Sequence, residues 1–512
     1  EIGARLQIAT GIDTANGIEV MYHWALDEED AVVTVRATVP HEDPVLDSVA
    51  DVCDAAEWIE REIWELLGVE FRGHPDLRHL LLDDGWPEGN YPLRKQVDSY
   101  APVEGRLAAE KPRSSEHETD RPQGDLPQDG NRPQSGKKTI VPIGPYHALQ
   151  EEPEFFKLHV EGETVVGLDI ELGYNHRGIE KLSESKTYEE TVFLVERICG
   201  ICSTSHPIAC VQAAEDAGHI TVPERALFIR SIVGELERIH SHLLWLGLAG
   251  HFVGFNTLWM WAWRYREDVL NILELITGNR NHYGMMKPGG VRRDINDTDI
   301  PAINTLLTGL QDPIKIFRDA VIEDPLVHAR TRGVGILSRE KAIAYGALGP
   351  TARASGYDID VRRDHPHAAY DKVEWDVITT ENGDVFDKAV VRILEMFESI
   401  RIIEQCLHEL ALIRGPVDSD PPFVAPGEGV GHYEAPRGEV FHYIRSDGSN
   451  RPVRHKVRAP SFMNVPTNRE TVLGETVADA TIILAAVDPC YCCTERMAVA
   501  LNSPGGERLW GA

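Results

Sequence analysis

Cysteine is scarce in this sequence, with 8 residues in 512. So few thiols exclude a disulfide-stapled secreted scaffold. Positive charge is also in short supply, because 51 lysines and arginines face 82 acidic residues and leave a formal net charge of −31. Such a chain repels phosphate groups, so we expect no nucleic acid as a partner. With 42% hydrophobic and 26% charged residues, the composition is that of a soluble globular protein and excludes bulk disorder.

Long apolar runs are almost missing too. One stretch, 243–263, is long enough to cross a bilayer, but it holds His251, Asn256 and three glycines. Spanning helices rarely carry polar groups at mid-span, so we expect a buried pair of core helices with the aromatic residues of 245–263 in the hydrophobic core. The chain begins at Glu1 without a methionine, and its first residues show no signal-peptide pattern.

The chain is too long for one ordinary core, and its composition divides it into three parts. Residues 1–96 carry strand and helix patterns and predict an α+β domain. Residues 97–139 are rich in Pro, Gly, Gln, Ser and charge and predict a flexible linker. Residues 140–512 predict a mainly α-helical domain with a small β portion.

Individual elements follow from the apolar spacing. In the first part, alternation predicts strands at 19–26 and 31–39, and a helix is expected over 45–67. In the last part, helices are expected over 188–200, 207–218, 224–246 and 384–412, and strands around 156–168 and 453–457.

Five of the eight cysteines gather in two tight clusters, and each cluster contains a C-x-x-C pair. The pairs are Cys199 with Cys202 and Cys490 with Cys493, separated by 288 positions. Together they offer four soft sulfur ligands, which suit zinc, an Fe–S cluster or a nickel–iron unit. A structural zinc site usually closes a shorter loop. Spacing alone leaves three interpretations open: zinc or a simple Fe–S cluster, a catalytic metal centre, or unrelated thiols.

The flanks of the two pairs carry more information. R-I-C-G-I-C-x-x-x-H at 197–206 and D-P-C-x-x-C-x-x-R at 488–496 resemble the paired signature of nickel–iron hydrogenase large subunits. Many of these proteins have histidine at the position of Arg496. An arginine there resembles their membrane-associated, energy-converting branch, which is related to the 49 kDa subunit of respiratory complex I. Further stretches resemble the same scaffold: 173–181, 289–294, 349–356 and 360–362.

The N-terminal part resembles a different protein. Residues 60–68, 71–77 and 92–95 are similar to the 30 kDa subunit of complex I. A fusion of the two parts in this order resembles the large subunit of formate hydrogenlyase-type hydrogenases. A 49 kDa subunit of complex I lacks the four cysteines, so the resemblance favours hydrogen chemistry over quinone binding.

This resemblance implies a role for each cysteine of the two pairs. Cys199 and Cys490 would be terminal ligands of nickel, and Cys202 and Cys493 would bridge nickel to an iron that carries carbon monoxide and cyanide. The resemblance also implies a proton relay at Glu180, because burial can tune a carboxylate for proton transfer. The alternative for Glu180 is a salt bridge with a neighbouring Lys or Arg.

Other residues are expected around this centre. His206 would hydrogen-bond a bridging sulfur, with a core histidine as the alternative. Asp488 and Arg469 would lie close to the metal pair, and Arg469 would donate to a cyanide. Cys492 is expected to be a small buried residue, like Cys53, Cys210 and Cys406.

The resemblance implies the catalytic subunit of a multisubunit membrane-bound hydrogenase that interconverts protons and dihydrogen. This chain has no further cysteines arranged for an Fe–S cluster, so electrons would pass through partners: a small subunit with a 4Fe–4S cluster, a ferredoxin-like Fe–S subunit, and membrane subunits related to complex I. The expected place is the cytoplasmic face of the cell membrane. The tail after Arg496 indicates either a relative that is not cleaved or an unprocessed form. The alternatives are a complex I-like quinone-cavity subunit without metal, with a role for His176, and a structural zinc subunit.

Overall fold

The computed structural model describes residues 3–95, 138–147, 150–419 and 424–495. The expected linker, 97–139, lies outside the described residues except for its last two positions. The tail after Arg496 lies outside them as well.

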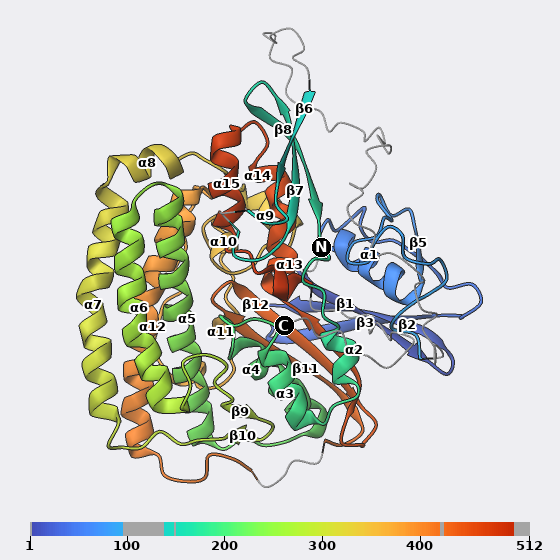
Figure 1. The fold of residues 1–512 in the computed structure, drawn as a ribbon. Helices are drawn as coiled ribbons and strands as arrows, with labels where there is room; N and C mark the ends of the chain where they lie inside the picture. The colour runs from blue at the N-terminus through green and yellow to red at the C-terminus, as the bar shows by residue number, and fades with distance from the viewer. Residues whose placement is uncertain (1–2, 96–137, 148–149, 420–423, 496–512) are drawn as a thin grey trace, which may run out of the picture.

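The N-terminal unit is a small sheet covered by one helix, drawn in blue in Figure 1. Its strands pair antiparallel in chain order, and they are β1 (Arg5–Thr14), β2 (Gly17–Leu26) and β3 (Ala31–Val39). The second and third strands confirm the strands expected over 19–26 and 31–39, although burial does not alternate strictly along them. The helix α1 (Ala56–Leu67) ends at Gly68, whose φ of 74° suits a residue without a side chain.

The start of α1 corrects the expectation of a helix over 45–67. The first residues of that range form β4 (Val45–Asp47), which pairs in parallel with β5 (Glu70–Arg72). Backbone groups committed to this ladder cannot make helical bonds, so α1 begins eleven residues later than expected.

A second sheet and three helices flank the first cysteine pair in the chain. The antiparallel strands are β6 (Lys138–Ile143), β7 (Phe155–Glu161) and β8 (Thr164–Glu171). The helices are α2 (Ile179–Ser183), α3 (Tyr188–Glu196) and α4 (Ser205–Gly218). A reciprocal pair of bonds between Thr187 and Glu190 fixes the start of α3.

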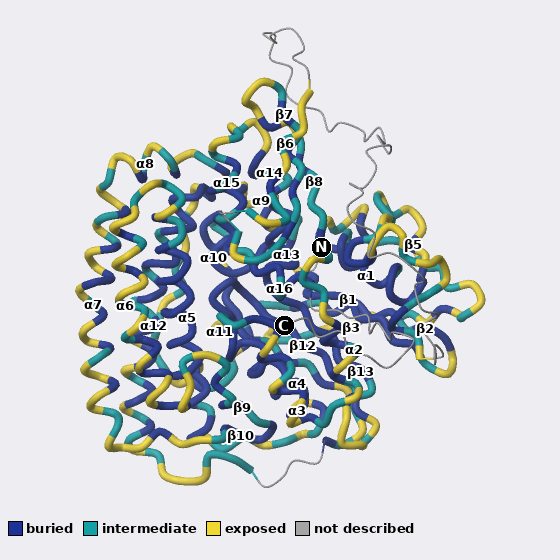
Figure 2. The backbone as a smooth tube through the Cα atoms, in the orientation of Figure 1, coloured by how far each residue is buried: buried dark blue, intermediate teal, exposed yellow. Residues whose placement is uncertain are grey.

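Four long helices form a bundle on the left of Figure 1, and they bury the sides that face one another (Figure 2). They are α5 (Glu224–Phe252), α6 (Asn256–Thr277), α7 (Ile300–Glu323) and α12 (Val385–Leu412). Shorter elements complete this part: β9 (Met286–Lys287), β10 (Gly290–Val291), α8 (Pro325–Thr331), α9 (Arg339–Ala344), α10 (Gly349–Arg353), α11 (Val361–Asp364) and η1 (Tyr370–Lys372).

The apolar stretch 243–263 is a helix pair, as expected, but its second half is only partly in the core. The turn between α5 and α6 falls at 253–255. Met260 is 68% exposed and Trp261 45% exposed, because α6 packs on α5 along one side only. None of the helices in the described part of the chain combines the length and the apolar character needed to cross a bilayer.

The C-terminal part adds a central sheet and the helices around the second cysteine pair. The antiparallel strands are β11 (Gly427–Ala435), β12 (Gly438–Ser446) and β13 (Pro452–Arg458). The helices are α13 (Pro460–Asn464), η2 (Val465–Thr467), α14 (Asn468–Thr471), α15 (Val477–Ala486) and α16 (Tyr491–Thr494). Helix α4 lies directly on this sheet. The approach is so close that a side chain at Gly429 or Gly431 would overlap the α4 backbone.

The N-terminal unit packs against the rest of the chain through a shared core. One hydrophobic cluster contains residues from β1, β2 and α1 together with residues from β12, α13 and α15. Buried ion pairs cross the same contact, such as Arg5 with Glu439 at 2.7 Å and Lys456 with Glu62. The division into two separately folding domains stays a prediction.

Candidate metal centre

The first cysteine pair lies in the loop between α3 and α4. The Cys199 sulfur accepts hydrogen bonds from the backbone N–H groups of Ile201 and Cys202, both at 3.4 Å. The carboxylate of Glu237, on α5, accepts from the backbone N–H groups of Thr204 and Ser205 at the start of α4. These bonds fix the loop from both ends, since the helix start would otherwise leave buried donors unsatisfied.

The second pair lies at the start of α16, with Cys490 directly before the helix and Cys493 within it. It follows Asp488, which has a positive φ of 54°, uncommon for a residue other than glycine. The backbone N–H of Cys490 donates to the hydroxyl of Ser461 at 3.0 Å. A backbone conformation of this kind is sterically unfavourable and is found where the surroundings enforce it, often at functional sites.

The structure brings all four sulfurs together in the interior. The Cys490 and Cys493 sulfurs are 2.9 Å apart, and those of Cys199, Cys202 and Cys493 lie within 4.8 Å of one another. Each cysteine is at most 4% exposed. Hydrogen bonds from the other three thiols lower the pKa of Cys199, whereas burial raises the pKa of Cys490 and Cys493. A buried set of four convergent soft donors fits a thiophilic metal unit.

Cys492 does not belong to this set. It is half-buried, and its sulfur faces the Asn175 side-chain oxygen at 3.6 Å. The expectation of a small buried residue is therefore too strong for Cys492 and for the half-buried Cys53, whereas Cys210 and Cys406 are buried.

A buried arginine, Arg437, contacts the thiol cluster. Its Nη1 lies 3.5 Å from the Cys202 sulfur, and its Nη2 pairs with the Asp488 carboxylate at 2.7 Å. Its Nε donates to the Asp488 carbonyl at 2.8 Å. Burial opposes the charge on this guanidinium, but Asp488 and the nearby thiols raise the pKa of Arg437 well above its ordinary value. Asp488 therefore holds this arginine beside the cysteines, and its closeness to a metal pair stays a prediction.

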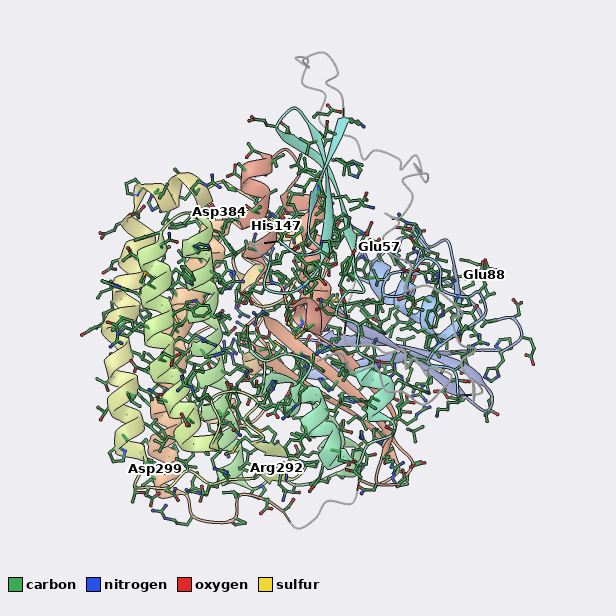
Figure 3. The ribbon with its side chains drawn as sticks, viewed as in Figure 1. Glu57, Glu88, His147, Arg292, Asp299 and Asp384 are labelled. Atoms are coloured by element: carbon green, nitrogen blue, oxygen red, sulfur yellow. The ribbon has the colours of Figure 1, made fainter. Side chains whose placement is uncertain are left out.

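The sequence predicts Arg469, and not Arg437, beside the metal pair. Arg469 pairs with Glu57 of α1 at 2.7 Å and lies over the ring of Trp58. Glu57 is labelled in Figure 3, between the N-terminal unit and the rest of the chain. The contact with the thiol cluster that we expected from Arg469 is made by Arg437, because α14 directs Arg469 toward α1 instead.

Sequence reasoning also missed a carboxylate at the cluster. Glu152, just before β7, faces the Cys490 sulfur at 3.7 Å and accepts from the Cys492 backbone N–H at 2.7 Å. Burial and the negative charge on Cys199 raise the pKa of Glu152. The expected relay, Glu180, is buried, pairs with Arg454 at 2.8 Å and accepts from the Val457 backbone N–H at 3.0 Å. Glu180 thus forms a salt bridge with an arginine distant in sequence, and its role as a relay stays a prediction.

One arginine connects the two cysteine loops. Arg177 donates to the carbonyls of Arg197 and Ile198 in the first loop, both at 2.8 Å, and to the carbonyl of Cys492 in the second at 3.0 Å. Its neighbour His176 faces the Glu495 carbonyl at 3.1 Å. The segment before α2 thereby holds the two loops in register.

His206 lies on α4, fully buried, and its Nδ1 faces the Nε2 of His442 at 3.2 Å. The expected hydrogen bond to a bridging sulfur stays a prediction. A narrow, mostly apolar cavity of about 40 Å³ adjoins the second cysteine loop. Glu151, Phe156, Trp245, Asp488 and Tyr491 are among its lining residues.

Three known protein families match parts of this chain. The respiratory-chain NADH dehydrogenase 30 kDa subunit matches residues 3–103, and the 49 kDa subunit matches 253–426 and 417–496. The nickel-dependent hydrogenase family matches 177–248, which includes the first cysteine pair.

Individual relatives extend this likeness over most of the chain. Formate hydrogenlyase subunit 5 of Escherichia coli is 37% identical over 91% of this chain and 80% of its own length. Membrane-bound hydrogenase subunit alpha of Pyrococcus furiosus is 40% identical over 70% of this chain and 88% of its own length. A chain of an archaeal membrane-bound sulfane sulfur reductase superposes with a TM-score of 0.67 at 29% identity, covering 72% of this chain and all of that one. The chain therefore belongs to the family of formate hydrogenlyase-type, membrane-bound nickel–iron hydrogenase large subunits, in which a part like the complex I 30 kDa subunit precedes a part like the 49 kDa subunit.

Proposed function

We propose that this chain is the catalytic subunit of a membrane-bound nickel–iron hydrogenase. The observation that carries the proposal is the convergence of four buried cysteine sulfurs from two loops far apart in sequence. Cys199, Cys202, Cys490 and Cys493 would hold the metal pair. When bound, such a centre supplies the redox chemistry that interconverts dihydrogen with two protons and two electrons.

The protein would contribute charge balance and rigidity. Four thiolates concentrate negative charge in a site of low dielectric, which needs compensation. The Arg437 guanidinium, at 3.5 Å from the Cys202 sulfur, supplies a positive charge at a fixed place. Asp488 orients that guanidinium through its carboxylate and its carbonyl. Arg177 keeps the two loops at a constant separation.

Proton transfer between the cluster and its surroundings would use Glu152. Its carboxylate lies within reach of the Cys490 sulfur, so a proton can pass between these two groups without free water. The raised pKa of Glu152 brings its proton affinity closer to neutrality, which suits a group that must both accept and release a proton. The expected relay, Glu180, whose carboxylate pairs with Arg454, stays the alternative to Glu152.

Electrons would leave through Fe–S clusters of partner subunits: a small subunit with a 4Fe–4S cluster and a ferredoxin-like subunit. Membrane subunits of the complex I type would hold the assembly at the cytoplasmic face of the membrane, with this chain peripheral. The relatives come from membrane-bound complexes, which supports this part of the proposal. We further propose that the part before residue 97 is a docking domain.

A second candidate is a complex I-like subunit that forms a quinone cavity without metal, favoured by the match to the 49 kDa family. Four convergent cysteines have no purpose in that function. Activity of the purified complex separates the two: hydrogen evolution from a reduced viologen should be lost in Cys490→Ser and retained in Cys406→Ser, a buried cysteine on α12. Equal activity in the two variants, or none in the parent complex, would sink the proposal.

A further inference from the structure

A second group of metal-ligating side chains lies apart from the four cysteines of the proposed centre. Cys210, His442 and His455 each offer one ligand atom, and these atoms lie within 4.8 Å of one another. All three residues are buried, at 3%, 0% and 0% exposed. They come from three elements, α4, β12 and β13, so their approach is a product of the tertiary fold.

The hydrogen bonds around the two histidines leave one nitrogen of each ring facing the other. His455 Nδ1 lies 3.1 Å from the Ser183 hydroxyl, which itself donates to the Glu180 carbonyl at 2.7 Å. The hydroxyl proton is thus committed, so His455 Nδ1 is the donor and its Nε2 carries a lone pair. His442 directs its Nε2 toward His206 at 3.2 Å and its Nδ1 toward His455 Nε2 at 2.8 Å.

This is the arrangement of metal-binding histidines in proteins. A ligating imidazole holds the metal with one nitrogen and donates from the other to a fixed partner, which sets its tautomer and orientation. Here Ser183 is the outer partner of His455, and His206 is the outer partner of His442. One thiolate and two imidazoles form a donor set of intermediate softness, which suits Zn²⁺.

We propose that Cys210, His442 and His455 bind one Zn²⁺ ion that fastens α4 to the central sheet. The thiol proton of Cys210 leaves to solvent as the Zn–S bond forms. His442 changes tautomer: its Nδ1 proton leaves, its Nε2 takes the Nδ1 proton of His206, and a proton taken up at His206 Nε2 balances the one lost. Zn–N bonds of about 2.0–2.1 Å in a tetrahedral site put two nitrogens about 3.3 Å apart, so the two rings separate by about half an ångström on binding.

The position of this site gives it a structural role. Helix α4 follows directly after the first cysteine pair, and β12 begins one residue after Arg437. An ion that joins α4 to β12 and β13 would therefore fix the two elements that directly follow Cys202 and its guanidinium partner in the chain. The inference does not depend on the proposed nickel–iron centre, because none of the three ligands belongs to it.

Cobalt titration of the full-length chain tests the site. Alanine at 199, 202, 490 and 493 removes the other thiol cluster, and in that background we expect one equivalent of Co²⁺ with a thiolate-to-metal charge-transfer band. Adding Cys210→Ser should abolish the band and the binding. Adding Cys406→Ser should change neither, because Cys406 is an equally buried cysteine on α12 whose pKa burial also raises.

Three results would overturn the inference: no Co²⁺ bound in the background, binding that survives Cys210→Ser, or equal loss with Cys406→Ser. The first would mean that the histidines form a hydrogen-bonded chain and nothing more. Should the background fail to fold, zinc analysis of the otherwise native chain decides. Cys210→Ser must then hold one equivalent less than Cys406→Ser, and equal zinc contents would refute the site.

Discussion

Loss of the Arg437 guanidinium should damage both the stability of the fold and the capacity of the thiol cluster to hold metal. Arg437 is 2% exposed, and its ion pair with Asp488 is 2.7 Å long and equally buried. Removing one partner of a buried ion pair leaves the other charge uncompensated and costs about 3–5 kcal/mol. We expect Arg437→Met to lower the free energy of unfolding of the metal-free chain by that amount.

Urea denaturation of the metal-free variants measures this cost. Neutralising the partner separates the ion pair from simple packing, so Arg437→Met should cost far less in an Asp488→Asn background than alone. Bound nickel, measured on the matured complex, should fall in Arg437→Met because the positive charge next to Cys202 is lost. Arg437→Lys should restore part of the stability but not the nickel, since one ammonium cannot reach Asp488, Ser241 and the sulfur together.

Arg469→Met is the matched control. The pair between Arg469 and Glu57 is 15–19% exposed, so its loss should cost about 1 kcal/mol and leave bound nickel unchanged. The reasoning is refuted if Arg469→Met lowers the nickel content as much as Arg437→Met, or if Arg437→Met and Asp488→Asn act additively.

Three further predictions concern proton transfer, loop geometry and pH. Glu152→Gln should slow isotope exchange between dihydrogen and heavy water at least tenfold. Glu180→Gln should lower the thermal midpoint of unfolding and leave the exchange rate per bound nickel unchanged. The reverse pattern would assign the relay to Glu180. Arg177→Lys should reduce bound nickel, because an ammonium cannot donate to both cysteine loops in the fork geometry of a guanidinium, and unchanged nickel would contradict a positioning role. Burial lowers the pKa of His23 to about 3, so between pH 6.5 and 3 the unfolded chain binds a proton that the folded chain excludes. The free energy of unfolding should therefore decrease as the pH is lowered from 6.5 to 3, and this decrease should be shallower in His23→Asn. Parallel pH profiles of the two proteins would rule out this contribution.

Local pattern was enough to predict many of the elements. Alternation located β2 and β3, and helical spacing located α5 and α12, because these segments follow their own periodicity. The start of α1 was missed, since the pairing of β4 with β5 is a contact between segments more than twenty residues apart. The exposed aromatic residues of α6 were missed for a related reason: hydrophobicity predicts burial only where a neighbouring element covers the side chain.

The candidate metal centre was likewise predictable from the sequence only in part. The two C-x-x-C pairs have a spacing that any reader of the sequence can recognise, and they do converge. Arg437 carries no such signal, because it stands in the tight turn between β11 and β12, where an arginine is ordinarily exposed. It is buried because Asp488, Ser241 of α5 and the Cys202 sulfur surround its guanidinium. Glu152 gave no signal either, as one of many acidic residues in a chain with 82 of them.

The most direct test of the central claim is the metal content of the matured chain, measured by elemental analysis together with infrared spectroscopy in the carbonyl and cyanide stretching region. The account predicts about one nickel per chain, together with iron and with bands of both ligands. It also predicts that Cys490→Ser loses the nickel and the bands while Cys406→Ser keeps them. Zinc at the four thiols, or a chain without nickel that remains active, would contradict the account.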